Sequence, residues 1–161
     1  MRVINSKDIT SAIKKLSIEA NYFINEDVLK VLEKSYNCEQ SPVGKEILSQ
    51  IIKNNKIASE KCMPICQDTG VAVVFVELGQ DVHVEGDINK AINEGVRQGY
   101  KEGYLRKSMV ENPLYRKNTE DNTPAVIHIK IVPGDKIKLT IAPKGGGSEN
   151  MSKIKMLKPL E

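Results

Sequence analysis

The sequence predicts an α+β domain in which an N-terminal layer of helices packs on a mixed β-sheet. Three patterns carry this prediction. Apolar residues recur at helical spacing over the first sixty residues, a nearly continuous apolar run occupies residues 71–78, and residues 125–131 and 137–141 alternate between apolar and polar. With 161 residues, 40% of them hydrophobic and 28% charged, the chain fits one globular domain.

Three helices are expected in the first sixty residues. Ser6 or Asp8 can cap the first, and Asn25 can cap the second. Ser41, followed by proline, marks the start of the third, which we expect to stop near residues 54–55, ahead of a separate turn. The apolar face predicted for the first helix consists of Ile9, Ala12, Ile13, Leu16 and Ala20.

The remaining elements follow from local signals. Residues 71–78 are predicted to form a strand buried on both faces, followed by a short extended piece at 81–85. Asp87 can cap a helix over residues 88–102, which Gly103 ends. Residues 104–123 form a polar loop of a length that is usually functional or disordered. The alternating segments on either side of Pro133-Gly134 are predicted to form an antiparallel hairpin, and a short helix is expected around residues 154–157.

Composition argues against several classes of protein. The formal net charge is only +3 and aromatic residues make up 4%, so a stacking surface for single-stranded nucleic acid is hard to assemble. The longest apolar run, residues 71–76, is far shorter than the ~20 residues that span a bilayer. Residues 1–7 contain no apolar signal segment, and three cysteines without one indicate a reducing cytoplasm. We therefore expect a cytoplasmic protein without nucleic-acid or membrane partners.

The candidate site is the string Cys66-Gln67-Asp68-Thr69-Gly70, which directly precedes the apolar strand. Turn formation explains Asp-Thr-Gly, because Asp caps the local backbone and Gly permits positive φ. It does not explain the thiol and the amide before them, so the string predicts a site. The Cys62–Cys66 spacing is not a usual zinc or thioredoxin pattern, and a single cysteine needs metal ligands from elsewhere. We interpret Cys38 and Cys62 as incidental.

Other chemistry-bearing residues leave alternatives open. His83 and His128 lie opposite the apolar residues of their strands and are predicted to be solvated, which gives little support to a catalytic triad. The glycine triplet at 145–147 forms either an anion-binding nest of backbone amides or a flexible linker. Arg106 either grips a carboxylate or lies on the surface. The residues alone thus indicate a site for a small carboxylate, with Cys66 marking a metal or redox centre.

Three segments carry a resemblance to a known family: residues 64–70 (Pro-Ile-Cys-Gln-Asp-Thr-Gly), 118–125 (Asn-Thr-Glu-Asp-Asn-Thr-Pro-Ala) and 144–150 (Lys-Gly-Gly-Gly-Ser-Glu-Asn). In order and separation they resemble the N-terminal domain of the iron–sulfur-dependent class I fumarase and L-tartrate dehydratase α-subunit family. The resemblance implies a hydro-lyase that reversibly hydrates a four-carbon dicarboxylate such as fumarate. It also implies a [4Fe–4S] cluster held by three cysteines, with one iron open as a Lewis acid.

The resemblance also implies roles for particular residues. Cys66 aligns with a cluster ligand, whereas Gln67, Asp68, Arg106 and Gly147 align with residues that contact substrate. Asp68 is the best candidate for transferring a proton or for orienting the group that does so. The other two cluster cysteines are expected beyond residue 161, since Cys38 and Cys62 do not match their positions.

We therefore expect residues 1–161 to be one N-terminal domain, incomplete at its C-terminus and inactive alone. Its expected partners are the dicarboxylate, the remaining α segment and a β subunit or domain, in a homo- or hetero-oligomer. The chain departs from the family pattern at Glu120, where glycine is usual. The alternatives are an L-tartrate dehydratase α subunit, a non-catalytic carboxylate-binding module, and a thiol redox protein that uses Cys62 and Cys66.

Overall fold

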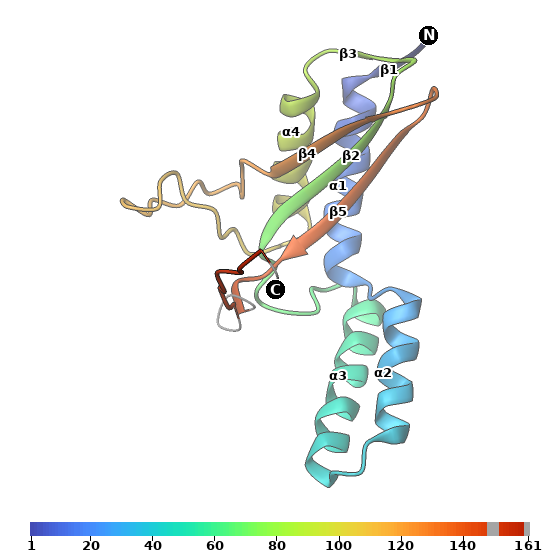
Figure 1. The fold of residues 1–161 in the computed structure, drawn as a ribbon, viewed down its shortest axis with the longest axis vertical. Coiled ribbons are helices and arrows are strands. Elements are labelled where there is room, and N and C mark those ends of the chain that lie inside the picture. The colour runs from blue at the N-terminus through green and yellow to red at the C-terminus, as the bar shows by residue number, and fades with distance from the viewer. Residues whose placement is uncertain (148–151, 160–161) are drawn as a thin grey trace.

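A computed structural model describes residues 1–147 and 152–159 and confirms the α+β class (Figure 1). It contains a two-stranded sheet, a three-stranded sheet and four helices in these residues. The elements in chain order are β1 (Arg2–Asn5), α1 (Ser6–Tyr22), α2 (Glu26–Cys38), α3 (Pro42–Lys61), β2 (Val71–Gly79), β3 (Val82–Glu85), α4 (Ile88–Glu102), β4 (Val126–Val132) and β5 (Ile137–Lys144). No helix in the part of the chain that the structure describes is long and apolar enough to cross a bilayer.

The larger sheet is mixed, as predicted, but the predicted hairpin is wrong. Strand β2 lies in the middle, parallel to β4 and antiparallel to β5, so the two alternating segments pair with β2 and not with each other. The end of β2 fits inside the turn that joins them, where the amide of Gly79 donates to the Lys136 carbonyl at 2.8 Å. A Cβ at Gly79 would lie 2.4 Å from the Gly134 carbonyl oxygen, so only glycine fits there.

The core lies between this sheet and a layer made of α1 and α4. Its fully buried side chains come from all three elements and include Ile13, Val74 and Ile92. The two helices approach closely because α4 presents glycines: a Cβ at Gly99 would lie 2.7 Å from the Cβ of Ser17. Of the three N-terminal helices, α1 therefore supplies the layer together with α4, which comes from the middle of the chain (Figure 1).

The other face of the sheet is open, so the prediction that β2 is buried on both faces is wrong. Phe75 of β2 is 44% exposed and stacks on His128 of β4, with ring centroids 5.2 Å apart. None of the described helices covers this face (Figure 1). His83 and His128 are both exposed, as predicted.

Helices α2 and α3 form a two-helix arm (residues 26–61) that projects from the rest of the domain (Figure 1). None of the 13 residues of α2 is buried, and α3 buries Asn55 and Ala58. The prediction that α3 stops near residues 54–55 is wrong, because both asparagines are accommodated within the helix. Asn54 donates to the Ile65 carbonyl outside the helix, and Asn55 donates to the Ile51 carbonyl one turn earlier, a bond that leaves the helix continuous to Lys61.

At the N-terminus the structure has a strand that was not predicted, and the residue that caps the first helix differs from the predicted ones. Residues 2–5 form β1, which pairs in parallel with β3, and Asn5 caps α1 by accepting from the Lys7 amide at 2.9 Å. Neither Ser6 nor Asp8 is the cap, since both lie within the helix. The caps predicted at Ser41 and Asp87 are confirmed by side-chain hydrogen bonds, and α4 spans residues 88–102 as expected.

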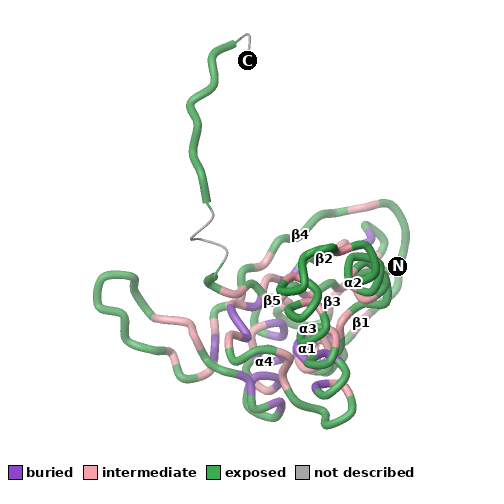
Figure 2. Tube along the Cα trace, turned by 90° about the horizontal axis from the view of Figure 1, so that it is seen from below, coloured by how far each residue is buried: buried purple, intermediate pink, exposed green. Residues whose placement is uncertain are grey.

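The helix predicted near the C-terminus is absent from residues 152–159, which the structure describes without regular secondary structure. Figure 2 shows this segment as an exposed trace leading away from the domain. Ile154 is 93% exposed, so its apolar side chain gains nothing from packing, and so short a helix is not stable by itself. Residues 148–151, which precede this segment, lie outside the described residues.

Candidate functional site

The Cys66–Gly70 segment forms a turn whose second half is held from three sides. The Tyr100 hydroxyl on α4 donates to the Thr69 carbonyl at 2.9 Å, and Asn122 Nδ2 donates to the Gly70 carbonyl at 3.1 Å. Thr69 is 2% exposed, and its hydroxyl donates to the Arg106 carbonyl at 2.9 Å. The start of the 104–123 loop is thereby fixed against the turn.

Gly70 lets the end of β5 approach the same turn. Its φ is +63°, and a Cβ there would lie 2.2 Å from the Lys144 carbonyl oxygen, so no other residue fits. The glycine triplet that follows Lys144 then reaches Asp68. Gly146 donates its amide to Asp68 Oδ2 at 2.8 Å, and Gly70 donates to Oδ1 at 3.2 Å. One amide of the predicted anion nest thus already binds a carboxylate of the chain itself.

Cys66 lies at the exposed end of the turn. The backbone amide of Asp68 points at its sulfur with an N–S distance of 3.4 Å, and the thiol contacts Gln67 Oε1, also at 3.4 Å. Hydrogen bonds to the cysteine sulfur are among the contacts that tune a bound metal cluster. The described residues contain no group of three or more His, Cys, Asp or Glu that could hold a metal ion.

The predicted site residues come together around this turn to different degrees. Cys66, Gln67 and Asp68 are adjacent, and Gly147 follows the glycine that binds Asp68. Arg106 joins them through its main chain, while its side chain is exposed, as are those of Cys66 and Gln67. A Cβ at Gly147 would meet no described atom within 4 Å. The exposed Cys38 lies at the far end of α2 and is not part of the site.

Two residues of the site have no role in the sequence-based prediction. Tyr100 is 1% exposed, and burial, together with the negative charge of Asp68, raises its pKa to about 12, although Asn21 acts in the opposite direction. Asn122 is fully buried and accepts from the amides of Ser108 and Met109 at 2.7 and 3.2 Å. No local pattern in a polar loop indicates which asparagine is buried. The only signal in the sequence that points to Asn122 is its place in the 118–125 segment.

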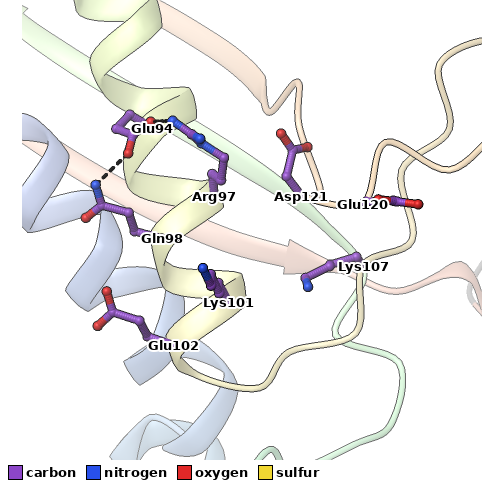
Figure 3. A pocket seen from close by; sticks show the side chains of 8 residues that line it. All are labelled: Glu94, Arg97, Gln98, Lys101, Glu102, Lys107, Glu120 and Asp121. Atoms are coloured by element: carbon purple, nitrogen blue, oxygen red, sulfur yellow. Dashed lines mark hydrogen bonds and ion pairs between the residues drawn. The ribbon is translucent and has the colours of Figure 1, made fainter.

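A separate cleft of ≈ 660 Å³ lies between α4 and the 104–123 loop (Figure 3). It is lined by Glu94, Arg97, Gln98, Lys101, Glu102, Lys107, Glu120 and Asp121, and it contains none of the predicted site residues. Burial opposes ionisation of Asp121, but hydrogen bonds from Thr123 and Thr119 and the charge of Arg97 together lower its pKa. Because charges of both signs line the cleft, it shows no preference for a dianion.

Comparison with known proteins identifies the class to which this fold and site belong. The sequence profile of the family described as Fumarate hydratase (Fumerase) matches residues 10–161. The chain therefore belongs to this family, whose similar members carry the names of fumarate hydratases and tartrate dehydratase α subunits, and the resemblance noted in the sequence is confirmed.

Individual relatives agree with the family assignment. A "Putative L(+)-tartrate dehydratase subunit alpha" from Methanocaldococcus jannaschii is 40% identical over 158 residues, which cover 94% of this chain and 55% of the relative. The "Fumarate hydratase class I, anaerobic" of Escherichia coli K12 is 37% identical over 114 residues, or 70% of this chain and 21% of that protein. The chain thus spans about half of the tartrate dehydratase subunit and about a fifth of the fumarate hydratase.

Proposed function

We propose that this chain is the N-terminal domain of a hydro-lyase that reversibly hydrates a four-carbon dicarboxylate, with fumarate and malate as the substrate pair. The observation that carries the proposal is the turn at 66–70. It places an exposed thiol, with an amide directed at its sulfur, beside the Asp68 carboxylate and the glycine triplet. The names of the relatives support the same reaction class.

Cys66 would hold one iron corner of a [4Fe–4S] cluster, and further ligands would come from residues outside this chain. The exposure of Cys66 supports this role, because an incoming segment could reach it without unfolding the turn. When bound, the cluster supplies a Lewis-acidic iron for the oxygen that is added or removed. By itself the chain holds one ligand of the set and is expected to be inactive.

The residues of this chain would bind the dicarboxylate and handle its proton. Arg106, with its exposed guanidinium, can grip one carboxylate through two parallel hydrogen bonds. Gln67 and the backbone at Gly147 can donate further hydrogen bonds to the substrate. Asp68 would take part in proton transfer or orient the group that does so. Its bonds from the amides of Gly70 and Gly146 support the orienting role.

The second candidate is dehydration of L-tartrate. It is favoured by the 40% identity with a relative named as a tartrate dehydratase α subunit. The described residues do not distinguish the two substrates, because tartrate and malate present the same pair of carboxylates to Arg106 and Gln67. A carboxylate-binding module without catalysis is the third candidate, and carboxylate binding with no requirement for iron would favour it.

The partners proposed for the chain are the remaining α segment and a β subunit or domain. Two relatives are named as α subunits, which supports an assembly of different chains. The open face of the sheet around Phe75 and the exposed Cys66 are consistent with a domain that is completed by further polypeptide. A cytoplasmic location stays a prediction from the cysteine content.

Anaerobic hydration of fumarate, followed by ultraviolet absorbance after reconstitution with iron and sulfide, tests the proposal. The chain is assayed alone and mixed with the remaining α and β segments. We expect activity only in the mixture, and we expect Cys66→Ser to abolish both the cluster absorbance and the activity. Cys38→Ser is the matched control, since it removes another exposed thiol and should change neither. Full cluster content and activity in the Cys66→Ser protein would contradict the ligand assignment.

A further inference from the structure

We infer that Asn122 is a positioning residue that sets the placement of the Arg106 segment relative to the Asp68 turn. The inference rests on the proposed function, because it concerns two residues proposed to contact the substrate. Asn122 itself is buried at 0% exposure, so it does not touch the substrate. It acts through the backbone on either side of it.

The amide group of Asn122 joins the two segments directly. Its Oδ1 accepts from the amides of Ser108 and Met109, two and three residues after Arg106. Its Nδ2 donates to the carbonyl of Gly70, whose own amide donates to Asp68 Oδ1. One side chain therefore connects the backbone beside the proposed carboxylate-binding arginine to the backbone that holds the proposed catalytic carboxylate.

A side chain that only filled space would not need this chemistry. Burying an amide without partners is costly, so a buried asparagine is favourable only where its bonds are made. The backbone at Asn122 also has φ 63°, a left-handed conformation that asparagine tolerates better than most other residues. Position 122 therefore has two requirements. The residue must tolerate a left-handed backbone, and its side chain must carry a hydrogen-bond donor and an acceptor that point to opposite sides.

The two requirements can be separated by substitution. Asn122→Gly keeps the left-handed backbone free of strain but removes the bridge. Asn122→Asp keeps the shape and the acceptor but replaces the donor with an oxygen that faces the Gly70 carbonyl. Asn112→Asp is the matched control, because it makes the same change in the exposed part of the same loop, where the oxygen that accepts from the Leu114 amide is retained.

Amide hydrogen exchange of the 161-residue chain, followed by NMR, tests the inference without activity. In Asn122→Gly, which removes the acceptor, we expect exchange to rise about tenfold or more at the amides of Ser108 and Met109. In Asn122→Asp, which keeps the acceptor but loses the donor, we expect the rise at the Gly70 amide, because repulsion at the Gly70 carbonyl loosens the turn. Amides of the α4 core such as that of Val96 should keep their protection in both variants. Asn112→Asp should match the wild type. Unchanged exchange at the three amides would overturn the inference, and so would an equal rise in α4, because that would indicate a general loss of stability.

Steady-state kinetics of the assembled enzyme measures KM for the dicarboxylate, which would not change if Asn122 only stabilised the fold. Displacing Arg106 should raise KM for the dicarboxylate about tenfold in Asn122→Asp. Lowering the pH should reverse part of this rise, because the introduced carboxyl group, once protonated, regains a donor for the Gly70 carbonyl. An unchanged KM in an active enzyme would overturn the inference. If the wild-type assembly is inactive on both fumarate and tartrate, the proposed function fails, and the exchange experiment still decides whether Asn122 positions the two segments.

Discussion

The two helix pairs of this domain differ in what holds them together. Helices α1 and α4 pack closely against each other and on the sheet, and side chains such as Ile13 and Val96 are fully buried. In the arm formed by α2 and α3, aliphatic side chains of the same kind are exposed, including Ile47 at 51% and Val31 at 62%. The stability of this chain therefore resides in the α1–α4 layer, whereas the arm adds little of its own.

The same isoleucine-to-alanine substitution should have very different effects in the two helix pairs. Ile13→Ala should lower the free energy of unfolding by about 3 kcal/mol, because it removes buried methylenes and leaves a cavity. Ile47→Ala should change it by less than about 0.5 kcal/mol, since half of that side chain is already in water. Urea unfolding followed by circular dichroism measures both. If both variants lost the same free energy of unfolding, the arm would be as important to stability as the rest of the domain.

The second comparison uses glycines within helices. Gly99→Ala should lower the free energy of unfolding by about 2 kcal/mol, because the new Cβ would lie 2.7 Å from the Ser17 Cβ and 2.9 Å from a backbone oxygen. Gly44→Ala in the arm is the matched control and should be neutral within about 0.5 kcal/mol. The three atoms nearest to its Cβ all belong to the flexible side chain of Glu39. Thermal or urea unfolding tests the pair, and a neutral Gly99→Ala would mean that α1 and α4 can separate at little cost.

The third comparison uses tyrosines and adds a pH dependence. Tyr100→Phe leaves the Thr69 carbonyl without its donor and should lower the free energy of unfolding by about 1.5 kcal/mol at pH 7. The folded-state pKa of about 12 lies above the ordinary tyrosine pKa of 10.0, so the stability that neutral Tyr100 provides is complete below pH 10 and is lost as the pH rises through 12. The difference between wild type and Tyr100→Phe should therefore shrink between pH 10 and 12.

Urea unfolding at about pH 7 and about pH 11 measures this effect. Tyr36→Phe in the arm is the control and should match the wild type at both values, because 37% of Tyr36 is exposed. A wild-type advantage of equal size at the two pH values would contradict the burial of the Tyr100 hydroxyl.

Local signals in the sequence predicted most of the elements. The caps at Ser41 and Asp87 and the end of α4 at Gly103 depend on neighbouring residues alone, and these were predicted correctly. The pairing of β4 and β5 depends on where β2 inserts, and their alternation is the same in either arrangement, so it was predicted wrongly. The buried face of α1 includes Ser17 and Asn21, whose polarity hides them from an apolar pattern, although close packing with Gly99 buries Ser17.

In the candidate site, too, local features could be predicted from the sequence and contacts between distant residues could not. The string 66–70 was visible in the sequence because five chemistry-bearing residues are consecutive. The contacts that hold the turn come from Tyr100 and Asn122, which are 30 and 52 residues from Gly70 along the chain. Nothing local marks such distant partners, so the sequence could predict that a site lies here but not what fixes its shape.

Among the non-glycine residues with left-handed backbone, Glu120 lies in the 104–123 loop (φ 65°) and Cys62 directly follows the arm (φ 49°). Glycine at position 120 would remove the left-handed strain at some entropic cost. Glu120→Gly should therefore raise the free energy of unfolding by about 0.5 kcal/mol. We expect the arm to open before the rest of the domain unfolds. The strain at Cys62 is then already released at the main unfolding transition, so Cys62→Gly should leave the urea midpoint of that transition unchanged. If both substitutions raised the urea midpoint equally, the arm and the rest of the domain would unfold as one cooperative unit.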